Sequence, residues 1–188
     1  QAAIVGMNNG LENGVVLGNV NGTIQVTGVQ TGGTSSIGNL TSNFPNPIGD
    51  IHNHPNNNPP SPGDVYSLIN IRNQFSEYNT RYVITQDGTT YALVVTDTIA
   101  MNNFLQNYPP YQALPNVSPN FPNNLFYEWS DVFTIYNGDK AMALSYILDK
   151  FNAGIALTKS DSAGNFKKIT VTENIINGSN NYTQTTCP

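Results

Sequence analysis

The stretch from Gly49 to Asp64 reads GDIHNHPNNNPPSPGD and contains both histidines of the 188-residue chain, His52 and His54. Residues two apart on a strand point to the same face, so a short strand ending at Pro55 would aim both imidazoles at one point. All of the chain's histidine is therefore placed where two ligands can meet one metal ion.

The end of this stretch predicts the start of a helix. Ser61 has the character of an N-cap, Pro62 suits the first helical position and Asp64 supplies an acid at the third. The helix is expected to run to about Phe75, which places Asp64 on its first turn. The chain between His54 and Asp64 is long enough for both to reach one ion. Two imidazoles and one carboxylate form a normal three-ligand Zn²⁺ set with a fourth position open for water.

A hydrolytic zinc site also needs a general base, and acids are scarce. Before the histidines the chain has only Glu12 and Asp50. Asp50 shares the strand parity of His52, so it would lie near the metal or hydrogen-bond an imidazole. Glu12 belongs to a strand predicted over residues 11–18 and can approach from a neighbouring strand to accept a proton from water.

The order of these residues resembles the JAMM/MPN (JAB domain) zinc metallopeptidases, in particular the bacterial-type members. A glutamate on an early strand is followed by His-x-His-Pro and then by Ser-x-x-Asp at a helix start. The resemblance implies that Glu12 is the general base, that His52, His54 and Asp64 hold zinc, and that Ser61 helps to stabilise the oxyanion.

The resemblance covers residues 11–96 and implies an α/β (α+β layered) fold, with a mixed central sheet flanked by helices in the JAMM/cytidine-deaminase-like architecture. Residues 97–188 would be a C-terminal helical and hairpin elaboration of a single domain spanning 1–188. Two departures from the family pattern stand out. The loop before Ser61 is one residue shorter than usual, which affects the direction in which the Ser61 hydroxyl points. Asn53 replaces the usual Ser or Thr between the histidines, but it should face away from the metal.

Periodicity and turn signals predict a mixture of strands and helices without strict βαβ alternation. Strands are expected over 11–18, 23–30, 48–54, 80–85, 90–96, 155–159 and 166–172. Helices are expected over 61–75 and 99–106, with a long helix within 126–151. Residues 31–47 and 107–124 should be loops, and the tail after Asn174 should be frayed.

Composition narrows the classes of partner. The net charge is −5 with seven Lys plus Arg and no basic run, which disfavours nucleic acid. No apolar run approaches the roughly 18 residues of a membrane span. The single cysteine, Cys187, cannot form an internal disulfide.

Low lysine and abundant asparagine favour an exported, extracellular protein over a cytoplasmic one. A start at Gln1 favours a mature or excised piece of a longer chain. The oligomeric state is not indicated.

The sequence favours a zinc-dependent hydrolase that cleaves a peptide or isopeptide bond in a peptide or protein substrate. One alternative is a catalytically weak or inactive metal-binding or processing module of a larger exported protein. Another is self-cleavage of a parent polypeptide. Simpler interpretations exist for individual residues: a metal-free surface loop for the histidines, a capping pair for Ser61 and Asp64, and an edge-strand acid for Glu12.

A cluster of aromatic residues lies before or on the predicted long helix. Packing in the core is the favoured interpretation, and lining of a substrate groove is the alternative. The cluster consists of Phe126, Tyr127, Trp129, Phe133 and Tyr136.

Overall fold

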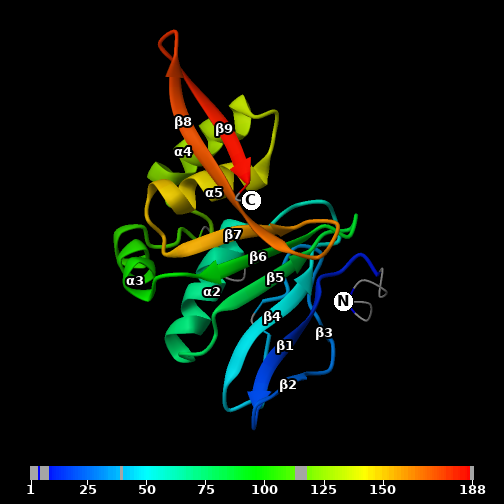
Figure 1. Cartoon of the computed structure of the whole chain (residues 1–188). Coiled ribbons are helices and arrows are strands. Elements are labelled where there is room, and N and C mark those ends of the chain that lie inside the picture. Colours follow the sequence, from blue (N-terminus) through cyan, green and yellow to red (C-terminus); the bar gives the residue numbers. More distant parts are fainter. Residues whose placement is uncertain (1–3, 5–8, 39, 113–117, 187–188) are drawn as a thin grey trace.

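The computed structural model of the chain describes residues 4, 9–38, 40–112 and 118–186, and Cys187 lies outside them. The fold is mixed α/β, with a nine-stranded sheet in the order β2-β1-β4-β5-β6-β7-β8-β9 and with β3 paired to β1 (Figure 1). The strands are β1 (Asn13–Val20), β2 (Thr23–Val26), β3 (Gln30–Thr31), β4 (Pro47–Asn53), β5 (Thr80–Ile84), β6 (Thr90–Val95), β7 (Ile155–Ser160), β8 (Phe166–Ile176) and β9 (Ser179–Thr186). The predicted mixed sheet flanked by helices is confirmed.

Strand β4 lies inside the sheet between β1 and β5. It is antiparallel to β1 and parallel to β5. His52 consequently has Gly14 as its neighbour on one side and Val83 on the other. This parallel pair needs a crossover connection, and helix α2 (Pro62–Gln74) provides it. The histidine strand and the start of α2 are thereby brought to one end of the sheet.

Helix α2 begins as the sequence predicts. Ser61 is the N-cap, and its side chain accepts a hydrogen bond from the backbone of Asp64, while the Asp64 side chain accepts one from the backbone of Ser61. This capping box satisfies amides that the first turn leaves without partners. The helix ends at Gln74, with Phe75 as its C-cap. The predicted capping pair and helix are both confirmed.

The prediction of one long helix within 126–151 is wrong, because two helices occupy this region. Helix α4 (Asn123–Ile135) and helix α5 (Lys140–Lys150) are separated by Asn137 and Gly138, with φ values of 51° and 88°. These left-handed conformations end a right-handed helix, and glycine adopts them without steric cost. Asp139 then caps α5 through its side chain. Helix α5 packs on β7 and β8, and α4 packs on α5.

The prediction of a frayed tail after Asn174 is also wrong. Strand β8 continues to Ile176, and β9 pairs with it along its whole length after a turn at Asn177 and Gly178. Buried Tyr182 fixes this hairpin by packing its ring edgewise on Tyr146, with the centroids 5.0 Å apart. In Figure 1 the hairpin rises away from the main sheet beside α4 and α5.

The remaining connections support the same core. Helix α3 (Thr98–Asn107) contacts α2, and buried side chains from α2, α3, α5 and strands β6 to β8 form one continuous apolar cluster. Within the part of the chain that the structure describes, no helix combines the length and apolar character that crossing a bilayer requires.

Candidate metal centre

Strand β4 directs alternate side chains into the site. Asp50 and His52 are fully buried, and His54, just after the strand, is 8% exposed. Asn53 faces the other way, as predicted, and its Oδ1 accepts a hydrogen bond from the backbone N–H of Asn13 at 2.6 Å. That bond connects the end of β4 to the segment that carries Glu12, so Asn53 helps to position Glu12 beside the histidines.

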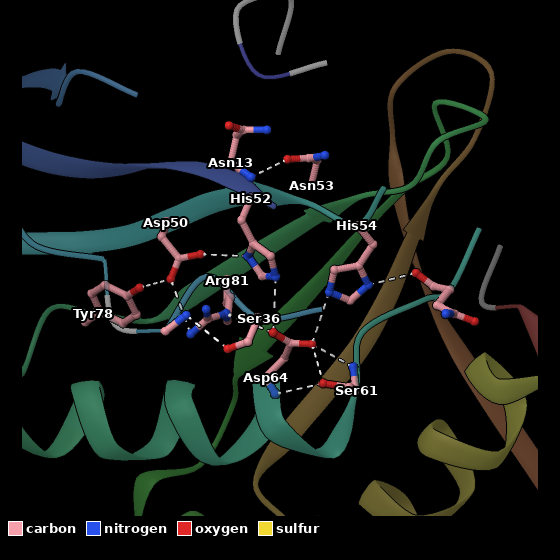
Figure 2. A network of polar contacts seen from close by, with 12 residues as sticks. Asn13, Ser36, Asp50, His52, Asn53, His54, Ser61, Asp64, Tyr78 and Arg81 are labelled. Atoms are coloured by element: carbon pink, nitrogen blue, oxygen red, sulfur yellow. Dashed lines mark hydrogen bonds and ion pairs between the residues drawn. The ribbon is translucent and has the colours of Figure 1, made fainter. Parts of the chain in front are cut away.

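The two imidazoles are each held through Nδ1. His52 Nδ1 lies 3.3 Å from Asp50 Oδ1, and His54 Nδ1 lies 2.9 Å from the carbonyl oxygen of Asn58. A neutral ring that donates from Nδ1 keeps the lone pair of Nε2 free for a metal. Both Nε2 atoms face Asp64 at the start of α2 (Figure 2), at 3.1 Å from Oδ1 for His52 and 3.6 Å from Oδ2 for His54.

Glu12 completes the group from a segment far earlier in the sequence. It sits immediately before β1, is 6% exposed, and is held by backbone bonds to Gly32 and Gly33 at 2.8 Å each. Glu12, His52 and His54 each offer a ligand atom, and these atoms all lie within 4.8 Å of one another. A buried carboxylate and two imidazoles at this spacing can hold a metal ion.

One buried atom supports this fit directly. His52 Nε2 is sealed from solvent and has no hydrogen-bond partner, and its contact with Asp64 Oδ1 at 3.1 Å is an ion pair. Buried polar nitrogens are rarely left unpaired, and an ion at this position would satisfy it. Nitrogen and oxygen donors suit zinc, and they suit other divalent transition metals as well.

The protonation of the site without an ion follows from burial and neighbouring charges. Burial and Arg81 act to lower the pKa of His52, but Asp64 and Asp50 outweigh them and raise it to about 9. For His54, burial dominates and the pKa is lowered. Burial also raises the pKa of Glu12 to about 7, a value at which a carboxyl group exchanges protons near neutrality. A bound cation would lower these values again.

Asp64 is the most heavily engaged acid of the site. Its Oδ2 accepts hydrogen bonds from the Ser61 backbone N–H and from the Ser61 hydroxyl, both at 2.7 Å. Burial acts to raise the pKa of Asp64, but His52, His54 and Arg81 hold it well below its usual range. Asp64 is therefore an anion whose orientation is fixed before any ligand arrives. In this arrangement the Ser61 hydroxyl proton points at Asp64.

Sequence reasoning missed Arg81. This β5 residue is 2% exposed, and its guanidinium lies between two acids, 3.6 Å from Asp50 Oδ2 and 3.4 Å from Asp64 Oδ1. The Tyr78 hydroxyl donates a further hydrogen bond to Asp50 Oδ2. Figure 2 shows this chain of contacts running from Tyr78 through Asp50 and His52 to Asp64. Arg81 lies two residues before buried Val83 on the same strand, so both side chains point to the same face. This alternation was the sequence signal that could have predicted a buried Arg81.

A cavity of about 310 Å³ opens beside these residues. Its lining is mainly polar and includes several serines besides Glu12, His54, Ser61, Asp64 and Arg81. The structure thus brings together Glu12, His52, His54, Ser61 and Asp64. All of them except the fully buried His52 line the cavity. Comparison with known proteins adds no family, since no protein-family model matches the chain and no curated protein is similar to it.

Proposed function

We propose that the protein is a zinc-dependent hydrolase of amide bonds, cleaving a peptide or isopeptide bond, and that it is a divergent relative of the JAMM/MPN metallopeptidases. The single observation that carries the proposal is the convergence of two inward-facing Nε2 atoms with two buried carboxylates beside a polar cavity. A purely structural cluster would not need to open onto a cavity.

The chain's own residues divide into ligands and reacting groups. His52, His54 and Asp64 would hold the ion, because their donor atoms already face one another and their other atoms are fixed by hydrogen bonds. When bound, zinc would supply a Lewis acid for the substrate carbonyl and lower the pKa of water. Glu12 would accept the proton of the attacking water and return it to the leaving amine. Ser61 would donate to the oxyanion after its hydroxyl turns from Asp64.

Metal analysis of the purified protein tests the proposal first. We expect one zinc per chain in wild type and loss of zinc in the His52→Ala/His54→Ala double variant. A panel of fluorogenic peptides and isopeptides then tests turnover, which should follow zinc content. Sub-stoichiometric zinc in the wild type, or zinc retained by the double variant, would contradict the proposal.

A second candidate function has one observation in its favour. The Ser61 hydroxyl is committed to Asp64 at 2.7 Å, so the group that should stabilise the oxyanion is engaged elsewhere. A metal-binding or processing module with weak or no turnover would have no use for a free hydroxyl. Full zinc occupancy together with no turnover across the same panel would favour this module over the hydrolase.

A further inference from the structure

A second cavity of about 240 Å³ adjoins the candidate metal centre. It shares Glu12, Ser35, His54 and Ser61 with the polar cavity, so the two cavities meet at residues of the candidate metal centre. Any molecule that fills the second cavity therefore reaches the metal centre.

The chemistry of the second cavity differs from that of the first. Carbon-rich side chains form much of its wall, namely Pro59, Pro60, Pro62, Phe126 and Trp129. Phe126 is 38% exposed, which is high for an apolar ring. It stacks on Trp129 with the ring centroids 6.1 Å apart, and Trp129 in turn stacks on Phe133 at 5.0 Å. Such a row presents a rigid aromatic face at little cost in conformational entropy.

One cation lies in the same wall. Lys140, the first residue of α5, donates a hydrogen bond to Asn58 Oδ1 at 2.8 Å, and Asn58 in turn holds His54 through its carbonyl. The cavity therefore combines an apolar face with a fixed positive charge. A lysine or arginine side chain against the apolar face would lose its hydration and meet repulsion from Lys140. Glu12, which both cavities share, is the one acidic side chain among the described residues of this lining that could offset that cost.

We propose that this cavity is a specificity subsite that binds a bulky apolar or aromatic side chain next to the amide to be cleaved, and that it selects against basic side chains. The subsite rests on the proposed function for its substrate class. The aromatic and cationic part of its wall comes from α4 and α5, so the second half of the chain would set specificity for a centre built by the first half. Phe126 and Trp129 are then groove residues, and Trp129 also packs against the core, as Phe133 and Tyr136 do.

Trp129 allows a binding test that needs no catalysis, because it is the only tryptophan of the chain. Two probes, N-acetyl-Ala-Phe-Ala-amide and N-acetyl-Ala-Lys-Ala-amide, are titrated into the wild-type protein while tryptophan fluorescence is recorded. We expect a saturable change with the phenylalanine probe, at a concentration about ten-fold lower than any change with the lysine probe. Equal responses to both probes, or none to either, would overturn the subsite.

Variants on helix α4 add a second measurement. Trp129→Ala should weaken binding of the phenylalanine probe about ten-fold by calorimetry and lower kcat/KM for the matching substrate by a similar factor. Tyr127→Ala is the control, since Tyr127 lies on the same helix, is 66% exposed and does not line the cavity. An equal effect of both variants would count against the subsite.

The two proposals fail separately. Hydrolysis without preference for the phenylalanine substrate would refute the subsite and leave the hydrolase. Selective probe binding that persists in the His52→Ala/His54→Ala variant, in a protein without turnover, would refute the hydrolase and support the cavity as an apolar binding site.

Discussion

Glu12 and Asp64 are the two candidates for the third ligand of the proposed zinc ion, and substitution at each should separate them. Glu12→Gln should retain zinc and lose turnover by about 10²- to 10⁴-fold, because an amide cannot accept the proton. Asp64→Asn should lose zinc, because the ligand with contacts to both histidines becomes neutral. Zinc content by mass spectrometry and peptide hydrolysis are the measurements.

The control for Asp64→Asn must account for the part that Asp64 plays in the capping box of α2. Asp97 caps α3 by accepting from the amides of Ile99 and Ala100, and it lies outside the metal centre. Asp97→Asn removes a carboxylate from the start of another helix and should leave zinc bound, with little loss of stability because Asn caps a helix about as well as Asp. Loss of zinc in Glu12→Gln with retention in Asp64→Asn would reverse the two assignments.

Arg81 should be worth more to stability than a surface cation. Arg81→Met leaves Asp50 and Asp64 buried without their cation, which should lower the free energy of unfolding by about 3–5 kcal/mol. Lys150→Met removes an exposed pair with Glu128 and should cost about 1 kcal/mol or less. Urea unfolding of both variants in the presence of a chelator measures the difference, and equal losses would contradict a central role for Arg81.

At the scale of single residues, most of the candidate site could be predicted from spacing along the chain. His52, His54, Ser61 and Asp64 lie within one short segment, where strand parity and helix capping decide direction. Arg81 could not be placed in this way, because its contacts depend on the parallel register that sets it opposite Asp50. No local pattern specifies which strand becomes the neighbour of another.

At the scale of elements, Gly14 brings strand β1 close to the candidate metal centre. A Cβ at this position would lie 3.0 Å from His52 Cβ and 2.8 Å from Leu40 Cδ1. Gly14→Ala should therefore displace His52, weaken zinc binding and cost about 1–3 kcal/mol of unfolding free energy. Gly28→Ala is the matched control, because a Cβ there would meet nothing within 4 Å.

Isothermal titration with zinc and thermal unfolding compare these two glycine variants. The expected result is weaker binding and lower stability for Gly14→Ala alone. Wild-type affinity in Gly14→Ala would show that His52 does not depend on the close approach of β1.

The elements that the sequence predicts correctly are those with strong local signals, such as the β1–β2 hairpin and α2. The break between α4 and α5 and the turn before β9 carry the same Asn-Gly signal as the first hairpin, at Asn137-Gly138 and Asn177-Gly178. Strand β9 was not predicted, because its sequence SNNYTQTT is polar. Its Tyr182 is nevertheless buried against the helices. Pairing with β8, rather than apolar alternation, defines that strand.

For the molecule as a whole, zinc should act as a stabilising ligand. A protein whose folded state alone forms the site gains about 2.7 kcal/mol when free zinc is 100 times its dissociation constant. For a chain of this size the gain should raise Tm by about 5–10 °C. Calorimetry with and without chelator measures the shift, which should vanish in the His52→Ala/His54→Ala variant. An equal shift in that variant would place the metal elsewhere.

Anomalous diffraction from zinc-loaded crystals tests the central claim most directly. We predict one zinc peak at about 2.0–2.2 Å from Nε2 of both His52 and His54 and from an Asp64 oxygen, with the Glu12 carboxylate beside the ion but unbonded to it. A peak bound to Glu12 in place of Asp64 would contradict the assignment of base and ligand. A crystal in which the two histidines bind no metal would contradict the account itself.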